Sequence, residues 1–371
     1  VFHEGKGFIK ETLYTEGGRF SLSTTEDTIL DAESCYVIPG LIDIHFHGCA
    51  GHDFSDASLE GLAAIAKYQL TQGVTSICPA SMTLSPETLQ SICKCTRGFS
   101  WKGNTNGSRL VGINLEGPFI SNAKRGAQNP DYIRQADFSL LEQLQECAGG
   151  LVKLVTLAPE TPGAIDFIRQ VKQSELKDIS ISIGHTQSDY DTAKEAFACG
   201  ADHVTHLFNA MPPFTHRATS VIGAAFDNPD CFVEIICDGI HIAPSAVRAA
   251  FAMFGSERVV LISDSMRATG LSDGNYTLGG LNVQVNGKHA TLEDGTLAGS
   301  VTNLLECMRC AVSMGISLEN AIQCATINPA RAIRIDNDYG SLETGKAADF
   351  LLLDKNLTLA GVFIDGEKVD R

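Results

Sequence analysis

The sequence predicts an α/β protein, namely a (β/α)8 barrel of the TIM type with a small β-sandwich domain built from both chain termini. Between residues 39 and 339, eight short apolar runs alternate with segments of helical periodicity, whereas both ends of the chain show short β patterns and turn residues. Histidine, glutamate and aspartate residues follow the apolar runs, where barrel strands end and barrel enzymes carry their chemistry. We therefore expect a sandwich domain from residues 1–38 and 340–371 and a catalytic barrel from residues 39–339, with an open doubly wound sheet as the alternative.

The elements follow in chain order. Residues 8–37 contain short β segments and the turn residues Gly17 and Gly18, without helical periodicity. The apolar runs predicted as barrel strands are residues 41–46, 75–79, 110–115, 152–157, 179–183, 204–208, 232–236 and 259–262. The helices expected between them are residues 59–72, 86–96, 140–147, 162–176, 190–199 and 244–254, while the connection between the sixth and seventh runs is short and irregular.

The last hundred residues add further elements to the barrel. Residues 278–296 are rich in glycine and predict an inserted hairpin. Two helices are expected at residues 301–314 and 318–324. Residues 339–354 return to β character, and we expect them to join the N-terminal β segments.

Composition excludes several classes of function. The 371 residues carry a net charge of −16, which argues against a nucleic-acid partner because phosphate backbones are bound through surplus Lys and Arg. An anionic small substrate stays possible if one Arg is presented locally. No apolar run is long enough to span a membrane, and we expect a soluble protein. The twelve cysteines are scattered and form no tetrahedral thiolate pattern, so reduced thiols in the cytoplasm are the simplest interpretation.

A strand–helix–strand unit near the middle of the chain predicts half of a metal site. Residues 179–183 form a buried strand that ends at Gly184 and His185, a helix follows after a Ser188 cap, and residues 204–208 form the next strand with His206. Because the carboxyl ends of parallel strands meet on one side of a sheet, the two histidines share a rim. Imidazole is the commonest transition-metal ligand in proteins, and two on a rigid rim leave room for a carboxylate and a water.

Further polar residues fall on the same rim. His45 and His47 stand at positions i and i+2 at the end of the first apolar run, a pair that alone would be interpreted as a surface feature. Glu116 follows the third run and precedes a tight turn, where an isolated glutamate would usually be solvated or cap a helix. Convergence with His185 and His206 favours a role as a metal ligand.

Two residues are candidates for catalysis. Asp264 ends the last apolar run, and a carboxylate beside a metal-bound water is the expected general base, although it could instead cap the following turn. His241, in the segment Cys-Asp-Gly-Ile-His, could polarise a carbonyl and stabilise the oxyanion that develops on it; a structural histidine is the alternative.

These residues belong to a longer pattern of motifs. They are PGLIDIHFHG, NLEGPFIS with KRGAQNP, IGHT, THLFNAMPPFTHR, CDGIH, SDSM, LAGS, and NPAR with GSLETGKAADF. Through them the chain resembles the amidohydrolase superfamily and, within it, the deacetylases of N-acetylglucosamine 6-phosphate. The resemblance runs nearly from end to end.

The resemblance implies a metal-dependent hydrolysis of N-acetyl-D-glucosamine 6-phosphate to D-glucosamine 6-phosphate and acetate. Glu116, His185 and His206 would hold the catalytic metal, with Asp264 as proton acceptor and donor. His45 and His47, which some relatives lack, allow a second divalent ion that bridges through Glu116. One or two ions are therefore expected. Zinc is the first choice of metal and Fe2+ is the alternative.

The resemblance also implies which residues contact the substrate. They are Ala127, Gln128, Asn209, Ala210, Arg217, Asp238, Gly239, Ile240, His241, Leu297, Ala298 and Gly299. Arg217 would bind the phosphate, since its planar fork suits phosphate oxygens, although a surface charge is the simpler alternative; in the family this contact can come from the neighbouring subunit of a homodimer. Gln128 stands where many relatives have a histidine that touches the sugar, and we expect its hydrogen-bonding role to persist with altered strength.

Two other functions stay open at this point. Another amidohydrolase, such as a D-aminoacylase or a dihydropyrimidinase-like ring opener, would share the fold, but binuclear enzymes of that kind commonly bridge their metals with a carboxylated lysine where this chain has Glu116. A barrel kept as a sugar-phosphate sensor would require damaged chemistry, and Glu116, His185, His206 and Asp264 are all present.

Overall fold

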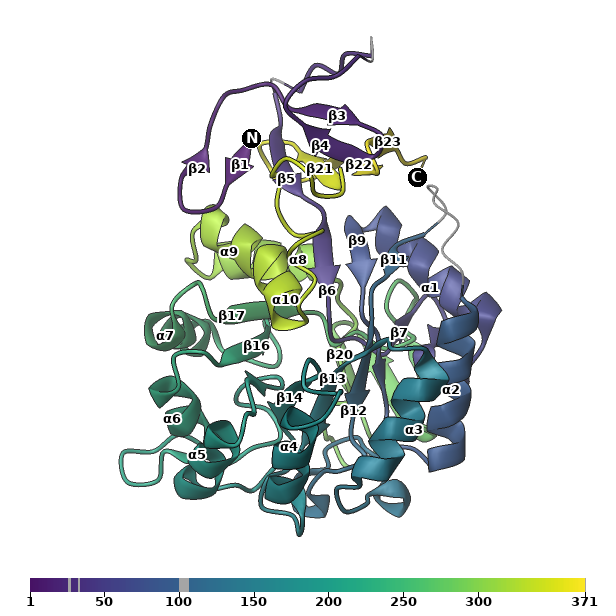
Figure 1. Cartoon of the computed structure of the whole chain (residues 1–371), viewed down its shortest axis with the longest axis vertical. Coiled ribbons are helices and arrows are strands. Elements are labelled where there is room, and N and C mark those ends of the chain that lie inside the picture. The colour runs from purple at the N-terminus through teal and green to yellow at the C-terminus, as the bar shows by residue number, and fades with distance from the viewer. Residues whose placement is uncertain (26–27, 33, 100–106, 371) are drawn as a thin grey trace.

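The computed structural model describes residues 1–25, 28–32, 34–99 and 107–370, and a barrel of parallel strands forms its centre (Figure 1). One sheet has the strand order β10-β12-β13-β14-β15-β16-β17 and a second has the order β11-β9-β6. β9 and β10 are two parts of one barrel strand, as are β11 and β12, so these segments supply the eight predicted strand positions. Their bounds are β6 Leu41–Asp43, β9 Val74–Ile77, β10 Ala80–Ser81, β11 Arg109–Leu110, β12 Ile113–Glu116, β13 Val152–Leu157, β14 Ser180–Ile183, β15 His203–Val204, β16 Phe232–Ile236 and β17 Val259–Ile262.

Hydrogen bonds between the first and last strand positions close the barrel at its carboxyl end. The backbone N–H of Asp264 donates to the carbonyl of His45 at 2.9 Å, and that of His47 donates to the carbonyl of Ser265 at 2.7 Å. The predicted barrel is therefore confirmed against the open-sheet alternative.

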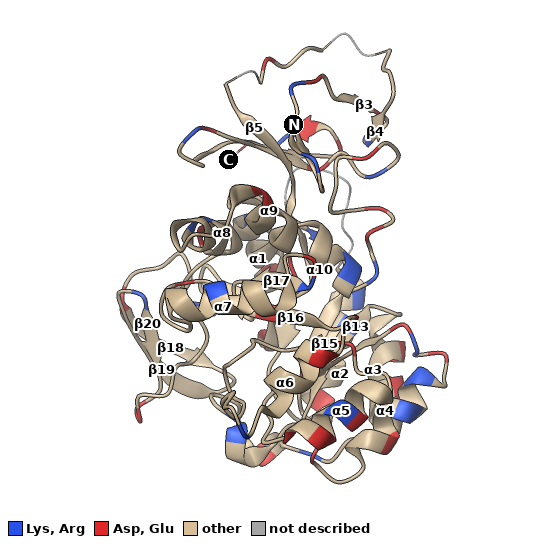
Figure 2. Ribbon diagram, turned by 90° about the vertical axis from the view of Figure 1, so that its left-hand side faces the viewer, with Lys and Arg blue, Asp and Glu red and all other residues tan. Residues whose placement is uncertain are grey.

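The small domain draws on both ends of the chain, as predicted. β5 (Tyr36–Pro39) pairs antiparallel with β21 (Phe350–Leu353), which continues the sheet through β22 (Leu359–Ile364) and β23 (Glu367–Lys368). Figures 1 and 2 show both termini at the same end of the molecule. The remaining short strands are β1 Phe2–His3, β2 Gly7–Phe8, β3 Tyr14–Glu16 and β4 Arg19–Ser21, with β3 and β4 joined at the predicted Gly17–Gly18 turn.

The passage between the two domains is tight. Gly40 connects β5 to β6, and a Cβ atom there would lie 2.1 Å from the hydroxyl oxygen of Thr75, so no larger residue fits without rearrangement. Because β5 leads directly into the start of β6, the small domain lies at the amino-terminal ends of the barrel strands. The opposite end of the barrel is left open. The division at residues 38/39 and 339/340 stays a prediction.

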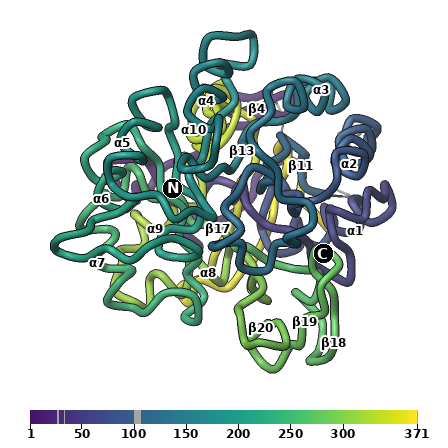
Figure 3. The backbone as a smooth tube through the Cα atoms, turned by 90° about the horizontal axis from the view of Figure 1, so that it is seen from below, coloured from purple at the N-terminus to yellow at the C-terminus, as the bar shows by residue number. Residues whose placement is uncertain are grey.

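Helices surround the barrel, as the tube viewed along it shows (Figure 3). Capping explains where several begin: the side chains of Ser58, Ser85 and Asp137 accept backbone N–H groups of the first turn of α1, α2 and α3, respectively. Pro86 and Pro244 occupy first-turn positions, where a missing N–H costs nothing. The helices are α1 Leu59–Thr71, α2 Pro86–Gly98, α3 Phe138–Ala148, α4 Ala164–Lys172, α5 Tyr190–Ala198, α6 Ser220–Asp227, α7 Pro244–Phe254, α8 Leu304–Ser313, α9 Leu318–Ala325 and α10 Ile327–Ala332, with short 3-10 turns η1 Phe54–Asp56, η2 Asn122–Lys124 and η3 Pro130–Tyr132.

Three local predictions were wrong. The strand expected at residues 204–208 ends at Val204, because His206 and Phe208 take left-handed backbone angles (φ 29° and 77°) that a strand cannot contain. The connection expected to be irregular contains α6, whose first six residues are all buried and so show no polar face. Asp189, rather than Ser188, caps α5 by accepting the backbone N–H of Thr192 at 2.9 Å.

The glycine-rich insertion is larger than the predicted hairpin. It forms a three-stranded antiparallel sheet of β18 (Gly274–Leu278), β19 (Leu281–Asn286) and β20 (His289–Thr291). Its inner side chains, among them Leu278 and Val283, pack with Met82 and Met266 near the barrel mouth. Two strands near the first barrel strand, β7 (Gly48–Cys49) and β8 (His52–Asp53), form a small ribbon.

Charged residues are spread over the outer elements. In Figure 2, acidic and basic positions alternate over α4 and α5 instead of separating into single-sign faces. Within the residues described, no helix combines the length and apolar character needed to cross a bilayer.

Candidate active site

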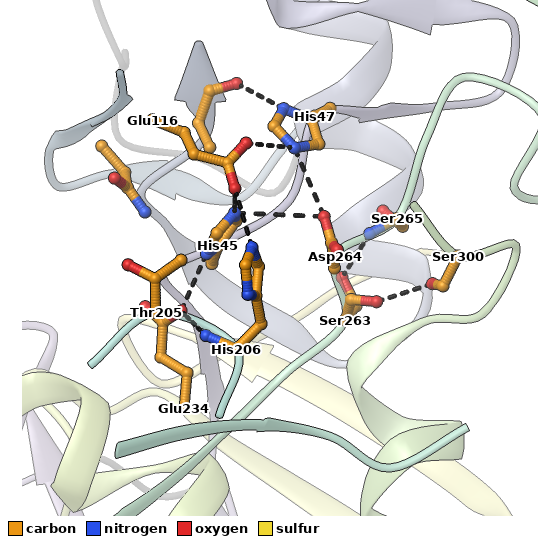
Figure 4. A network of polar contacts seen from close by, with 12 residues as sticks. His45, His47, Glu116, Thr205, His206, Glu234, Ser263, Asp264, Ser265 and Ser300 are labelled. Atoms are coloured by element: carbon orange, nitrogen blue, oxygen red, sulfur yellow. Dashed lines mark hydrogen bonds and ion pairs between the residues drawn. The ribbon is translucent and has the colours of Figure 1, made fainter. Parts of the chain in front are cut away.

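Six ionisable side chains converge at the carboxyl ends of the barrel strands, and Figure 4 shows five of them. They lie at or just after the ends of β6, β12, β14, β15 and β17 and are His45, His47, Glu116, His185, His206 and Asp264. Five of the six form two overlapping groups whose ligand atoms all lie within 4.8 Å of one another. We call Glu116, His185 and His206 the 185/206 triad, and His45, His47 and Glu116 the 45/47 triad.

The backbone turns sharply where three of these residues leave their strands. His185, His206 and Asp264 have φ angles of 46°, 29° and 48°, in the left-handed region that residues with side chains rarely adopt. Such conformations persist only where surrounding structure enforces them, and they concentrate at functional sites. Gly184 allows the turn before His185, because a Cβ atom at this position would lie 2.6 Å from that of Thr205.

Glu116 is the shared member of both triads. Its Oε1 lies 3.0 Å from Nε2 of His185 and 3.1 Å from Nε2 of His206. The same oxygen lies 3.4 Å from Nε2 of His45, and Oε2 lies 3.2 Å from Nε2 of His47. One carboxylate therefore faces four imidazole nitrogens, the position expected of a bridging ligand.

Partners outside the cluster orient the rings. Nδ1 of His185 lies 2.9 Å from the carbonyl of Lys124, and Nδ1 of His47 lies 3.1 Å from the carbonyl of Ala80. Because a carbonyl only accepts, each Nδ1 carries a proton, and in the neutral ring Nε2 is then the lone pair. This is the tautomer that a ligand imidazole needs.

Two buried atoms at the centre lack hydrogen-bond partners. They are Nε2 of His45 and Oδ1 of Asp264, which lie 3.9 Å apart, and Oδ1 of Asp264 lies 3.3 Å from Nε2 of His47. Buried polar atoms without partners are costly, so the cluster suits an additional positive group. Imidazole nitrogens and carboxylate oxygens are donors that fit a divalent transition metal.

Electrostatics in the cluster favour ionised carboxylates. Burial opposes ionisation of Glu116, but the neighbouring His45 and His185 hold the pKa of its carboxyl well below the ordinary value. Burial also opposes ionisation of Asp264, but the hydrogen bond with His47 keeps its pKa below the ordinary value. Burial disfavours protonated His47, yet Asp264 and Glu116 raise its pKa to about 10. The two carboxylates, Glu116 and Asp264, thus attract protons or a cation, and a bound metal would compete with those protons.

His241 forms a separate pair with Asp238 beside the cluster. The Nδ1 atom of His241 lies 2.7 Å from Oδ2 of Asp238, while Oδ1 accepts the backbone N–H groups of Ile240 and His241 at 2.8 and 2.9 Å. Burial lowers the pKa of His241, but Asp238 outweighs it and raises the pKa above the ordinary value. The paired carboxylate therefore favours an imidazolium whose Nε2 can donate a hydrogen bond.

A cavity of about 350 Å3 opens over these groups. Seven of the predicted substrate contacts line it, namely Ala127, Gln128, Asn209, Ala210, His241, Leu297 and Gly299. Asp238, Gly239, Ile240 and Ala298 are not among the residues that line the cavity, although Ile240 and Ala298 are next to lining residues in the sequence and Asp238 contacts His241. Arg217 is exposed and stands outside the cavity wall of this chain.

Gln128 uses both ends of its amide within the protein. Its Oε1 accepts the backbone N–H of Thr83 at 2.7 Å, which leaves Nε2 to donate to Oε2 of Glu116. Gln128 therefore holds Glu116 in place from the cavity wall. A sugar that contacts Gln128, as predicted, would have to form its hydrogen bond with an amide that already bonds to Thr83 and Glu116.

The sequence did not indicate several residues that the structure places at the site. Lys124, Met82 and Leu278 line the cavity, and Glu234 lies beneath it with contacts to His45 and His203. The position of Lys124 beside Arg125 and Gly126 in the motif KRGAQ could have indicated it. An isolated glutamate within an apolar strand gave no such signal.

Similarity to known proteins agrees with this geometry. The model of the amidohydrolase family matches residues 36–369. The N-acetylglucosamine-6-phosphate deacetylase of Bacillus subtilis (strain 168) is 39% identical over 322 residues, which cover 85% of this chain and 80% of the relative. The N-acetylgalactosamine-6-phosphate deacetylase of Escherichia coli O157:H7 is 32% identical and covers 92% of this chain and 89% of its own length.

A solved structure shares the fold over nearly its full length. It is a mutant N-acetyl-D-glucosamine-6-phosphate deacetylase from Mycobacterium smegmatis in complex with N-acetyl-D-glucosamine-6-phosphate, with a TM-score of 0.86 and 31% identity. The alignment covers 95% of this chain and 93% of that structure. Because the family model spans almost the whole chain and the Bacillus relative matches most of both sequences, the chain belongs to the amidohydrolase family.

Proposed function

We propose that this chain hydrolyses N-acetyl-D-glucosamine 6-phosphate to D-glucosamine 6-phosphate and acetate, as a metal-dependent deacetylase of amino-sugar catabolism. One observation carries the proposal: Asp264 and all three members of the 185/206 triad line the same cavity. The names and alignments of the relatives support the choice of substrate.

The 185/206 triad would hold the catalytic ion. His45 and His47 would hold a second ion, with Glu116 shared between the two. Zinc is the first choice and Fe2+ the alternative, because histidine and carboxylate ligands suit both. When bound there, the ion would supply Lewis-acid polarisation of the acetamide carbonyl and would lower the pKa of a water molecule.

Asp264 transfers the proton in this proposal. Its lowered pKa keeps the carboxylate ionised near neutral pH, so that it can accept a proton from the attacking water. The water oxygen bonds to the acetamide carbon, the C–N bond then breaks, and Asp264 returns the proton to the departing nitrogen. Acetate and the free amine result.

His241 stabilises the charge that develops on the carbonyl oxygen. Asp238 fixes its ring and favours the protonated form, so Nε2–H can donate to an oxyanion in the cavity. Residues from the wall would position the sugar; these are Ala127, Gln128, Asn209, Ala210, Leu297 and Gly299, with Asp238, Gly239, Ile240 and Ala298 supporting them.

Arg217 would bind the phosphate from across a homodimer interface. Its exposed position outside the cavity of its own chain is compatible with a role in a neighbouring site. Mixing Asp264→Asn subunits with Arg217→Ala subunits tests this directly, because only a mixed dimer would contain one intact site. Random pairing would restore about a quarter of the wild-type activity. A mixture with no more activity than the separate variants would exclude the shared site.

We place the reaction in the cytoplasm. All twelve cysteines lie within the described residues, and none is joined in a disulfide. Free thiols suit a reducing compartment.

Acetate release tests the function. The phosphorylated sugar, the plain sugar and N-acetyl-D-galactosamine 6-phosphate should be compared before and after chelation, with elemental analysis of the purified protein. We expect the glucosamine phosphate to be the best substrate, activity to vanish on chelation, and Zn2+ or Fe2+ to restore it. The galactosamine epimer is included because a relative with 32% identity bears that name.

Two results would contradict the proposal. Release of acetate that does not depend on the phosphate would favour another amidohydrolase of the same fold, such as a D-aminoacylase. Full activity after complete metal removal would exclude the metal-dependent reaction.

A further inference from the structure

Glu234 is a buried carboxylate that the proposed reaction does not use. It lies in the middle of β16 with no exposed surface, and it does not line the cavity. In Figure 4, Glu234 lies on the opposite side of His45 and His206 from Glu116. An ionisable group is rarely buried this deeply without paired partners.

Three N–H groups from different parts of the chain meet this carboxylate. Oε2 lies 2.8 Å from Nδ1 of His45 and accepts the backbone N–H of His206 at 3.1 Å. Oε1 lies 3.1 Å from Nε2 of His203. His45 belongs to the 45/47 triad and His206 to the 185/206 triad, so one carboxylate contacts both.

The contact with His45 fixes the state of that ring. An ionised carboxylate only accepts, so Nδ1 of His45 carries the proton that is shared with Glu234. Whenever the ring is neutral, Nε2 is therefore the lone pair; it faces Oε1 of Glu116 at 3.4 Å and has no hydrogen-bond partner. A ligand histidine commonly donates its second N–H to a carboxylate in this way.

The contact with His206 replaces a missing bond of the sheet. Pairing of β15 with β16 ends at Val204 and Val233, and His206 follows in a left-handed conformation. The side chain of Glu234 accepts the N–H of His206 at this point. The turn that aims the His206 ring at Glu116 therefore depends on Glu234 as well.

We propose that Glu234 is a positioning residue that makes His45 a metal ligand and holds the two triads in register, so that the chain binds an ion at the 45/47 triad. The inference rests on the proposed metal-dependent function. It assigns the capacity for a second ion to a residue that touches neither ion nor substrate.

Glu234→Gln is the informative substitution. The side chain keeps its size, but the amide nitrogen is a donor, and a donor facing Nδ1 of His45 favours the tautomer whose proton sits on Nε2. That proton would block the ligand position. We expect affinity at the 45/47 triad to fall about 10- to 100-fold, as for other lost carboxylate–histidine partners.

The experiment has two readouts besides activity. Metal binding is measured by titrating chelated, metal-free protein with Co2+ and following absorption and stoichiometry. Wild type is expected to bind two ions. Glu234→Gln should lose the same ion as His45→Gln. The variant that combines both substitutions should lose no further ion. Thr156→Val is the matched control, because Thr156 is a buried barrel residue that bonds to Thr205 at 2.8 Å and to no histidine.

The tautomer of His45 is the second readout and needs no Glu234 variant. Nitrogen NMR of zinc-loaded wild type labelled in histidine, with the His45 signal assigned by its absence in His45→Gln, should show a proton on Nδ1 and none on Nε2. In that zinc-loaded form, a proton on Nε2 or the lack of one on Nδ1 would overturn the inference even if Glu234→Gln fails to fold.

Other outcomes separate the inference from the function. A Glu234→Gln chain that binds two ions with unchanged affinity, or a wild type that binds one ion unaffected by the substitution, overturns the inference alone. A wild type that binds both ions but releases no acetate overturns the proposed deacetylation and leaves the role of Glu234 standing.

Discussion

At the mouth of the barrel, buried polar atoms of His45 and Asp264 have no hydrogen-bond partner. At the opposite end, by contrast, Arg331 and Arg109 form ion pairs with carboxylates. There, Arg331 forms two hydrogen bonds with Glu4 at 2.6 and 2.9 Å, which tie the N-terminal segment to α10. The first arrangement leaves room for a cation, and the second joins parts of the fold. Polar groups at the mouth are thus arranged so that they could bind a cation, and those at the other end hold parts of the fold together.

The two ends of the barrel also differ in the structure around their strands. His185, His206 and Asp264 hold left-handed angles at the mouth. At the amino-terminal end, Ile42 of β6 and Val260 of β17 pack in an apolar cluster that includes Ala330 of α10. Changes at the mouth should therefore affect turnover and metal content, and changes at the far end should affect stability. The following predictions test that separation, from the largest expected free-energy change to the smallest.

Asp264→Asn should lower kcat by about 10²–10⁴-fold, because the amide cannot accept the proton of the attacking water. Metal content, measured by elemental analysis, should remain largely intact. Asp166→Asn, which removes an exposed carboxylate paired with Arg169 on α4, should leave kcat unchanged. Substantial turnover by Asp264→Asn would remove Asp264 from the proton transfer.

Asp349→Asn should change how stability depends on pH. Burial raises the pKa of Asp349 from 3.8 to about 6, despite the attraction of Arg109. The stability that this group contributes is full below its unfolded pKa and is lost as pH rises through about 6, so relative to the variant the wild type should lose about 3 kcal/mol between these limits. Urea unfolding across this pH range checks it, with kcat as the control that should not move. Parallel pH profiles of the two proteins would contradict the assignment.

Gln128→Leu should lower kcat/KM by about tenfold, because Oε2 of Glu116 and the N–H of Thr83 each lose a buried partner. Steady-state kinetics and metal affinity measure the effect. Gln143→Leu, on the exposed face of α3, serves as the control. Unchanged kinetics in Gln128→Leu would show that Glu116 needs no support from the cavity wall.

Arg331→Gln should cost at most about 1 kcal/mol of unfolding free energy, since its pair with Glu4 is partly exposed. Chemical denaturation measures the loss, and kcat should equal that of wild type. A marked loss of activity would show that the two ends of the barrel are coupled.

Much of the fold could be predicted because its signals are local. The helix predicted at residues 244–254 is α7 itself, since Pro244 begins it and Gly255 ends it. The helix α6 could not be found by periodicity, because buried residues surround its axis and leave no polar face. The turn at His206 was also invisible, because a left-handed angle on a histidine is imposed by the tertiary structure.

The cluster itself could be predicted because parallel strands bring their ends together. The structure gathers His45, His47, Glu116, His185 and His206 as that rule requires. Glu234 could not be recognised, since its partner His45 lies 189 residues away in sequence. The amide contacts of Gln128 likewise depend on the position of Thr83 in space.

The most direct measurement is a crystal structure of the zinc-loaded chain with anomalous data collected at the zinc edge. The predicted result is a peak about 2.0–2.2 Å from Nε2 of His185, Nε2 of His206 and a carboxylate oxygen of Glu116. The absence of a peak there, with zinc bound elsewhere, would contradict the metal centre on which the proposed reaction depends.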